Sequence, residues 1–203
     1  MTKDILFATS NKNKFSEASE MIEREMMKKE TKELEAKDAI TLKHFPFSHD
    51  EIRSDSLEEV AHEAVEAAYQ QCKAPVFVED SGLFIESLNG FPGTFSGWVQ
   101  KKIGNEGILK LLSGEKEHES GRSAFFEACI AYHDGKTVRT YHGKCAGTIA
   151  SSIRGTSGFA YDHIFIPNGY SQTFAESIAL KNKISHRYLA LLEFSNYVLR
   201  QKD

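Results

Sequence analysis

The sequence predicts an α/β fold with a mixed central β-sheet and flanking helices. Short apolar runs of the buried-strand type alternate with stretches whose apolar residues recur at helical spacing. An Asp-Gly pair at residues 134–135 lies between two strand-like runs, which indicates a β-hairpin in addition to the strands that alternate with helices. The length of 203 residues suits one domain, or one domain with two lobes.

The first strand and the first helix are expected near the start of the chain. Residues 5–8 form a short apolar run, and the helix-start residues 9–11 follow it. From Phe15 onward, apolar and charged residues alternate with helical spacing. The highly charged run 23–38 is typical of a solvated helix face and the turn after it.

A capped helix and a second strand come next. Ser56 and Glu59 have the spacing of a capping box, which predicts a helix that starts at Ser56 and continues to about Gln71. Pro75 ends this helix, and the apolar run 76–78 predicts a strand. The apolar face of the helix is formed by Leu57, Val60, Ala61, Ala64, Val65 and Ala68.

The second half of the chain predicts a short helix, a hairpin of two long strands, a short strand and a final amphipathic helix. Pro167 closes the short strand, and Ser185 is the expected cap of the final helix. In chain order, these elements span residues 103–112, 123–133, 137–149, 164–166 and 184–201.

Composition excludes several classes of protein. The 25 basic and 29 acidic residues give a net charge of −4, so no bulk attraction to nucleic acid or membrane is expected. Cys72, Cys129 and Cys145 are odd in number and widely spaced, which favours buried thiols over disulfides or a zinc site. Residues 1–14 show no cleavage signal and no stretch is long enough to span a bilayer, so we expect a cytoplasmic protein.

The first candidate site is the junction between the first strand and the first helix, with the sequence ATSNKNK. A strand that runs into a helix through Ser10 and Asn11 exposes backbone N–H groups at the helix start, and such groups bind anions. Lys12 and Lys14 add positive charge, although the glycines of a Walker A loop are missing. The alternative is an ordinary helix cap with two surface lysines.

The second candidate site is a pair of acids after the strand 76–78. Glu79 and Asp80 point to opposite faces, and Asp80 is expected at the carboxyl end of the strand, where open α/β sheets bind ligands. Ser81-Gly82 would let the backbone turn away. Mg²⁺ suits such a carboxylate, and Glu51, in an exposed loop, is available as a second acid. A solvated strand end is the alternative.

The third candidate site lies in the segment RGTSGFAYDHIFIPNG, residues 154–169. Phe159, Tyr161 and Asp162 lie on a backbone made flexible by glycine, so they are able to stack on a heterocycle and hydrogen-bond its edge. The alternative is a turn that leads into a core strand, with the aromatic rings packed inside.

The final helix begins with a further group of polar side chains. His186 and Arg187 lie at its start, shortly after Lys181. Two cationic side chains and one titratable histidine, beside the N–H donors of a helix start, suit the binding of a polyanion or a purine carbonyl. The alternative is a capped helix with a surface histidine and arginine.

Six motifs occur in one order along nearly the whole chain: FATSNKNKFSEASEMI, VFVEDSGLFIESLNGFPGTFSGWV, NEGILKLL, GFAYDHIFIP, QTFAES and KNKISHRYLALLE. Their order resembles the inosine/xanthosine triphosphate pyrophosphatase family, also called Ham1-like proteins. The resemblance implies a single domain over residues 1–203, with two lobes around a substrate cleft. It also implies a homodimer that hydrolyses ITP, dITP and XTP to the monophosphate and pyrophosphate with Mg²⁺, which removes them from the nucleotide pool.

The resemblance also implies roles for individual residues. Asp80 resembles the proton acceptor and, with Glu51, the metal ligands. The phosphate-binding residues would be Thr9, Ser10, Asn11, Lys12, Asn13, Lys14 and Lys181. Further substrate contacts would come from Ser81, Phe159, Ala160, Tyr161, Asp162, His186 and Arg187.

Two positions depart from the family pattern. Ala64 stands where many relatives have a lysine in the helix after the Glu51 loop, so one phosphate contact is missing or supplied by another residue. Ala160 stands where many members have glycine, which would slightly narrow the base pocket.

Base selectivity is expected at the 6-keto edge, which hypoxanthine and xanthine have and adenine lacks. His186 and Arg187 would donate to this oxygen, and a mismatched buried polar edge gives discrimination of about 10⁴ or more. A module that binds nucleotides without cleaving them is the alternative function, although a pure binder gains little from two metal carboxylates. A nucleic-acid-binding protein is disfavoured by the net charge and the lack of a basic stripe.

Overall fold

The computed structural model describes residues 3–30, 40–114 and 120–200. The chain divides into two compact units. The first unit consists of Met1–Asp80, Cys129–Gly143 and Arg187–Asp203, and the second unit consists of Ser81–Ala128 and Lys144–His186. The expected substrate cleft stays a prediction.

The strands form a mixed sheet, as the sequence predicts. They pair in the order β2-β1-β3-β5-β6-β7, and β4 pairs with β3 outside this path. β1 is parallel to β2 and β3, whereas β4 is antiparallel to β3 and β7 is antiparallel to β6. The strands span Lys3–Ala8 (β1), Ile40–Phe45 (β2), Val76–Ile85 (β3), Pro92–Gly93 (β4), Ser123–His133 (β5), Val138–Ile149 (β6) and Phe165–Pro167 (β7).

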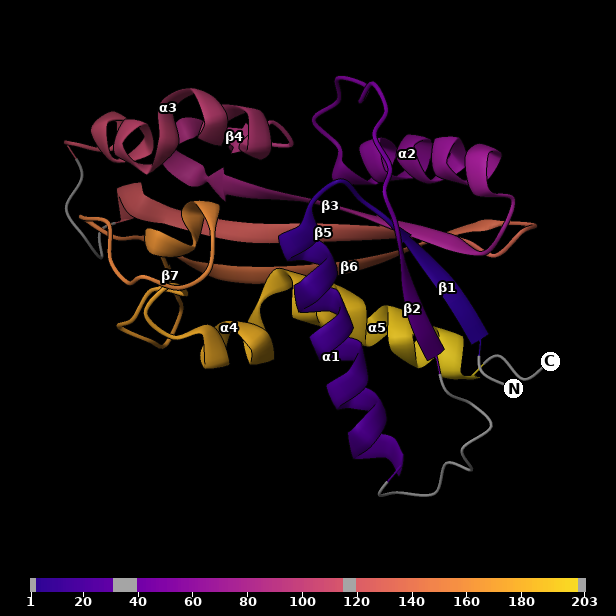
Figure 1. The fold of residues 1–203 in the computed structure, drawn as a ribbon. Coiled ribbons are helices and arrows are strands. Elements are labelled where there is room, and N and C mark those ends of the chain that lie inside the picture. The colour runs from indigo at the N-terminus through magenta and orange to yellow at the C-terminus, as the bar shows by residue number, and fades with distance from the viewer. Residues whose placement is uncertain (1–2, 31–39, 115–119, 201–203) are drawn as a thin grey trace. The chain divides into compact units, whose positions relative to one another are not determined.

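Helices cover both faces of the strands in the first unit. Helix α2 (Leu57–Cys72) lies on one side and α5 (His186–Arg200) on the other (Figure 1). Aromatic packing joins the strands to α5, because the Phe77 ring lies 4.3 Å from that of Phe7 and 4.8 Å from that of Phe194, between ring centroids. All six residues of the predicted apolar face of α2 are buried, including Ala64. Ala64 therefore belongs to the core of the first unit.

The start of α2 shows how its cap forms. The Ser56 side chain accepts a hydrogen bond from the N–H of Glu59 (3.3 Å), as the capping-box pattern predicts. The Glu59 carboxylate accepts a hydrogen bond from the Ser54 hydroxyl (2.6 Å), and Ser54 Oγ in turn accepts from the N–H of Ser56 (3.0 Å). In a capping box the Glu59 side chain would accept directly from the N–H of Ser56, whereas here Ser54 links the two groups.

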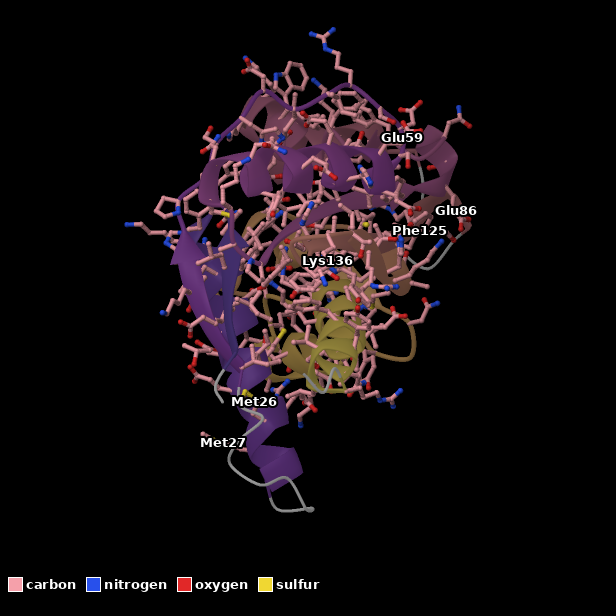
Figure 2. The ribbon with its side chains drawn as sticks, turned by 90° about the vertical axis from the view of Figure 1, so that its right-hand side faces the viewer. Met26, Met27, Glu59, Glu86, Phe125 and Lys136 are labelled. Atoms are coloured by element: carbon pink, nitrogen blue, oxygen red, sulfur yellow. The ribbon has the colours of Figure 1, made fainter. Side chains whose placement is uncertain are left out.

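Helix α1 (Lys12–Glu30) covers the first part of the charged run 23–38, and the rest of that run lies outside the described residues. Met26 and Met27 lie on the part of α1 that extends beyond the strands (Figure 2). Glu23 and Met27 are exposed, as the prediction of a solvated helix face requires, whereas Glu25 in the same run is buried.

The prediction that the second strand ends at Glu79 and Asp80 is wrong. β3 runs from Val76 to Ile85, so both acids lie in its middle. The backbone does not turn away at Gly82, because the second half of β3 pairs with β4. A Cβ at Gly82 would meet the carbonyl oxygen of Gly93, so glycine serves the close approach of two strands.

β3 changes its neighbours at these acids. Leu6 pairs with Val76 and Phe7 with Phe77, so β1 ends just before Glu79 is reached. The two acids therefore lie beside the carboxyl end of β1, where the chain turns into α1. This is the edge at which parallel strands of an α/β sheet present ligand-binding groups.

The second unit packs α3 and a short 3-10 helix around the ends of β3, β5, β6 and β7. Helix α3 (Ser96–Leu111) is broken at Gly104, whose φ is 63° and ψ −165°. The 3-10 helix η3 spans Ala160–His163, and α4 spans Ile178–Ile184. The buried core consists of Leu83, Ile85, Val99, Ile108, Leu112, Ala124, Phe126, Cys145, Ile149, Tyr161, Ile164, Phe165 and Phe174.

The hairpin is confirmed, and its turn is held by Asp134. Asp134 Oδ1 accepts hydrogen bonds from the N–H groups of Lys136 and Thr137, both at 2.8 Å, and Gly135 has a φ of 103°. The final strand and final helix are confirmed as β7 and α5. β2, α4 and the first half of α3 were not predicted. In the described ranges no helix has the length and apolarity that a bilayer crossing requires.

Cysteine usage agrees with the sequence interpretation. Cys129 and Cys145 are buried and Cys72 is half-buried, and no disulfide joins them in the structure. Burial raises the pKa of the Cys145 thiol to about 11.

Candidate active site

The first strand–helix junction is organised by Asn11. Thr9 Oγ1 accepts a hydrogen bond from the N–H of Asn11 (3.0 Å). Asn11 Oδ1 accepts from the N–H groups of Asn13 (3.0 Å) and Lys14 (3.3 Å), so Asn11 caps α1. The exposed residues of the junction are Ser10, Lys12 and Asn13. Solvent, and hence a phosphate, has access to this helix start.

Lys14 differs from the surface lysine that the alternative interpretation expects. Its side chain is only 18% exposed. Its Nζ lies 3.0 Å from the backbone oxygen of Glu79 and 3.1 Å from Glu79 Oε2. Lys12, by contrast, is exposed. One of the two lysines is thus fixed by tertiary contacts at the end of β1.

Arg187 lies against the same carboxylate. Its Nη2 is 3.3 Å from Glu79 Oε1, and its Nη1 is 2.6 Å from Glu17 Oε2. The Arg187 side chain is 3% exposed, so the alternative of a surface arginine is wrong. Burial lowers the pKa of the guanidinium, but the charges of Glu79 and Glu17 outweigh it, so the net pKa is raised and the group stays charged.

The predicted metal ligands both lie in the first unit. Asp80 is half-buried in the middle of β3, and Ser81, also half-buried, follows it as the first residue of the second unit. Glu51 is exposed in a segment without regular secondary structure. Over the described part of the chain, no group of three or more histidine, cysteine, aspartate or glutamate side chains is placed to hold a metal ion.

In the second unit the predicted base-recognition residues surround a buried ion pair. Lys181 Nζ lies 2.7 Å from Asp162 Oδ2, and both side chains are almost fully buried. The same oxygen accepts a hydrogen bond from the N–H of Phe159 (2.8 Å). The ammonium of Lys181 lies 4.5 Å from the centroid of the Phe159 ring, a cation–π distance. Lys181 is thus grouped with Phe159 and Asp162 in this unit.

The neighbouring residues of this segment have different environments. Tyr161 is part of the core, and its hydroxyl donates to the backbone oxygen of Ser96 (3.1 Å). Burial raises its pKa well above the ordinary range. Ala160 has a φ of 52°, in the left-handed region, and its carbonyl oxygen accepts from Asn105 Nδ2 (3.0 Å). A glycine would adopt this backbone conformation without strain.

His186 is buried as well. Its ring lies parallel to that of Phe126, with the centroids 4.5 Å apart and the planes at 14°. The side chain is 3% exposed, so the alternative of a surface histidine is wrong.

Sequence reasoning missed three residues at these sites. Glu79 was assigned to the face opposite Asp80 and given no role, yet it holds two predicted substrate-contacting cations. Glu17 and Asn105 were not considered. The signal for Glu79 was its position in a buried strand, where a carboxylate needs a cationic partner.

An α/β fold with an accessible helix start at the carboxyl end of a parallel strand is typical of proteins that bind nucleotides or other phosphate-containing anions. The comparison with known families defines the class further. The model of the Ham1 family matches residues 5–197, and the chain belongs to this family.

Named relatives match over nearly their whole length. The chain is 43% identical to a dITP/XTP pyrophosphatase of Thermococcus kodakarensis, over 96% of this chain and 96% of the relative. It is 40% identical to a dITP/XTP pyrophosphatase of Saccharolobus solfataricus, over 94% of this chain and 91% of the relative. The structure also resembles the solved Ham1 proteins of Staphylococcus aureus, with a TM-score of 0.77 at 25% identity, and of Coxiella burnetii, with a TM-score of 0.76 at 29% identity. Each comparison covers 98% of this chain and 100% of the other.

Proposed function

We propose that this protein hydrolyses the non-standard purine nucleoside triphosphates dITP, XTP and ITP to the monophosphate and pyrophosphate. The observation that carries the proposal is the sequence identity of 40% and 43%, over nearly the whole chain, to two relatives named dITP/XTP pyrophosphatases. Two features of the structure support it: the accessible capped junction at the start of α1, and the ion-paired side chains predicted to contact the substrate.

The reaction needs no covalent intermediate. Water attacks the α-phosphorus, the bond between this phosphorus and the bridging oxygen breaks, and pyrophosphate leaves. Asp80, or a water that it orients, accepts the proton of the attacking water. Lys14 stabilises the negative charge that develops on the phosphate oxygens, and its contact with Glu79 fixes its position before the substrate binds.

Mg²⁺ is part of the proposal. The carboxylates of Glu51 and Asp80 are the hard oxygen donors that this ion takes, and it accepts as few as one or two of them when water and phosphate oxygens complete its shell. When bound, Mg²⁺ would offset charge on the phosphate oxygens. The exposed position of Glu51 suits a ligand that meets a substrate-bound ion.

Base selection is assigned to the buried polar residues of the C-terminal third. His186 and Arg187 would donate to the 6-keto oxygen that adenine lacks. Phe159 offers a half-buried ring for stacking, and Asp162 with Lys181 fixes the backbone that carries it. A substrate with an amino group at this edge would leave buried donors without an acceptor, which lowers its rate of hydrolysis.

Three further expectations belong to the same proposal. A homodimer and a dependence on Mg²⁺ are implied by the resemblance to Ham1-like proteins, and a cytoplasmic location is expected from the sequence. Size-exclusion chromatography with light scattering would measure the first, and an activity assay with and without a chelator the second.

A panel of nucleotides tests the proposed activity. The protein is incubated with Mg²⁺ and dITP, XTP, ITP, dATP or dGTP, and pyrophosphate and monophosphate are quantified. We expect equal amounts of both products from the first three nucleotides and little from the last two. Tight binding of dITP without pyrophosphate release would instead identify a nucleotide-binding module.

A further inference from the structure

Glu79 is a deeply buried carboxylate with cationic partners in the first unit. Its side chain is 1% exposed, and it lies on β3 directly before Asp80. Lys14 Nζ contacts both its Oε2 (3.1 Å) and its backbone oxygen (3.0 Å). Arg187 Nη2 lies 3.3 Å and 3.4 Å from its two carboxylate oxygens. One side chain thus touches a predicted phosphate contact and a predicted base contact.

The electrostatics of this group require the carboxylate. A buried charge is costly unless it is paired and hydrogen-bonded. In this cluster the cations Lys14 and Arg187 lie against the anions Glu79 and Glu17. Glu17 reaches Arg187, and Glu79 is the acid that both cations share. Without the charge of Glu79, the two cations would repel each other and Lys14 would lose its acidic partner.

We propose that Glu79 is a positioning residue that holds Lys14 for the phosphate chain and Arg187 for the purine base. The inference rests on the proposed function, because it assigns these two cations to the substrate. Glu79 acts through Lys14 and Arg187 and does not touch the substrate. It couples the two ends of the site: a change at this one carboxylate alters both turnover and base selection.

The test compares Glu79→Gln with Glu25→Gln. Glu25 is a matched control, because it is also buried, lies on α1, and pairs with Tyr188 (3.2 Å) and Arg24 (3.9 Å), neither of which is a predicted substrate residue. For Glu79→Gln we expect kcat/KM for dITP to fall by about 10²-fold, since small displacements of a charged contact carry costs of this size. Most of the loss is expected in kcat. The ratio of dITP to dATP hydrolysis should also fall, and Glu25→Gln should stay close to the wild type in both.

A double-mutant cycle separates positioning from general stability. In a Lys14→Met background, Glu79→Gln should lower kcat much less than in the wild type, because the side chain that it positions is gone. Glu79→Asp keeps the charge with a shorter side chain, and should recover part of the activity.

Circular dichroism and a denaturation midpoint establish that each variant is folded. A folded Glu79→Gln variant with wild-type kcat and wild-type dITP/dATP ratio overturns the inference. If Glu79→Gln does not fold, Glu79→Asp replaces it, and unchanged kcat in that variant overturns the inference as well. A wild-type protein that releases no pyrophosphate from any of the nucleotides refutes the proposed function, and this inference with it. If the wild type releases pyrophosphate and the Glu79 variant behaves like it, the inference fails but the proposed function stands.

Discussion

Removal of one partner from the ion pair of Lys181 and Asp162 is expected to destabilise the second unit strongly. The paired atoms are 2.7 Å apart, and the two side chains are 1% and 5% exposed. Lys181→Met keeps most of the side-chain volume but leaves the carboxylate without its cation. Removal of one partner from a buried pair costs about 3–5 kcal/mol. Asp162 keeps the hydrogen bond from Phe159, so we expect the lower end, about 3 kcal/mol.

Thermal and urea denaturation measure this cost. For a chain of this length, 1 kcal/mol shifts Tm by about 2–4 °C, so Lys181→Met should lower Tm by about 6–12 °C. Lys183→Met is the matched control, because Lys183 lies on the same helix, α4, and is exposed. It should change the free energy of unfolding by less than about 0.5 kcal/mol.

The double variant Asp162→Asn with Lys181→Met tests the reasoning further. Because it removes both charges, its cost should be smaller than the sum of the two single costs, by about 1–3 kcal/mol. Additive costs, or a Lys181→Met variant as stable as Lys183→Met, would refute the view that this pair is held by mutual charge compensation.

Three other predictions follow from named contacts. Asp80→Asn should abolish pyrophosphate release while circular dichroism shows an unchanged fold; full activity in this variant would remove Asp80 from the mechanism. Ala160→Gly should stabilise the protein by about 0.5–1 kcal/mol, because relief of left-handed strain (roughly 1–2 kcal/mol) exceeds the added entropy of the unfolded chain (about 0.4–1 kcal/mol). Urea midpoints would measure it, and a destabilised variant would contradict it. Cys145, with its pKa raised from 9.0 to about 11, should resist iodoacetamide at pH 8 in the folded protein and react after unfolding. Since the folded form holds this proton more tightly, its contribution to stability is complete below about pH 9 and is lost as the pH rises through about 11. Mass spectrometry that found Cys145 labelled as fast as the half-buried Cys72 would contradict the burial.

Elements that depend on neighbouring residues in the chain were predicted well. The cap at Ser56 and the turn at Asp134 and Gly135 are held by hydrogen bonds within three residues. The apolar face of α2 follows from helical spacing alone. β3 was predicted too short because its second half is held by β4, and neither the glycine at 82 nor that at 93 reveals this contact in the sequence.

By itself, the sequence determined the α/β class, the family and the segments that carry the candidate site, because these depend on periodicity and on short motifs. Tertiary structure decided which charges meet. Glu79 is 65 residues from Lys14 and 108 from Arg187, and Asp162 is 19 from Lys181. A buried charge is stable only when folding brings an opposite charge to it, and that partner is chosen by the packing of distant elements. The sequence therefore identifies the candidate residues, whereas the fold assigns Glu79 its partners.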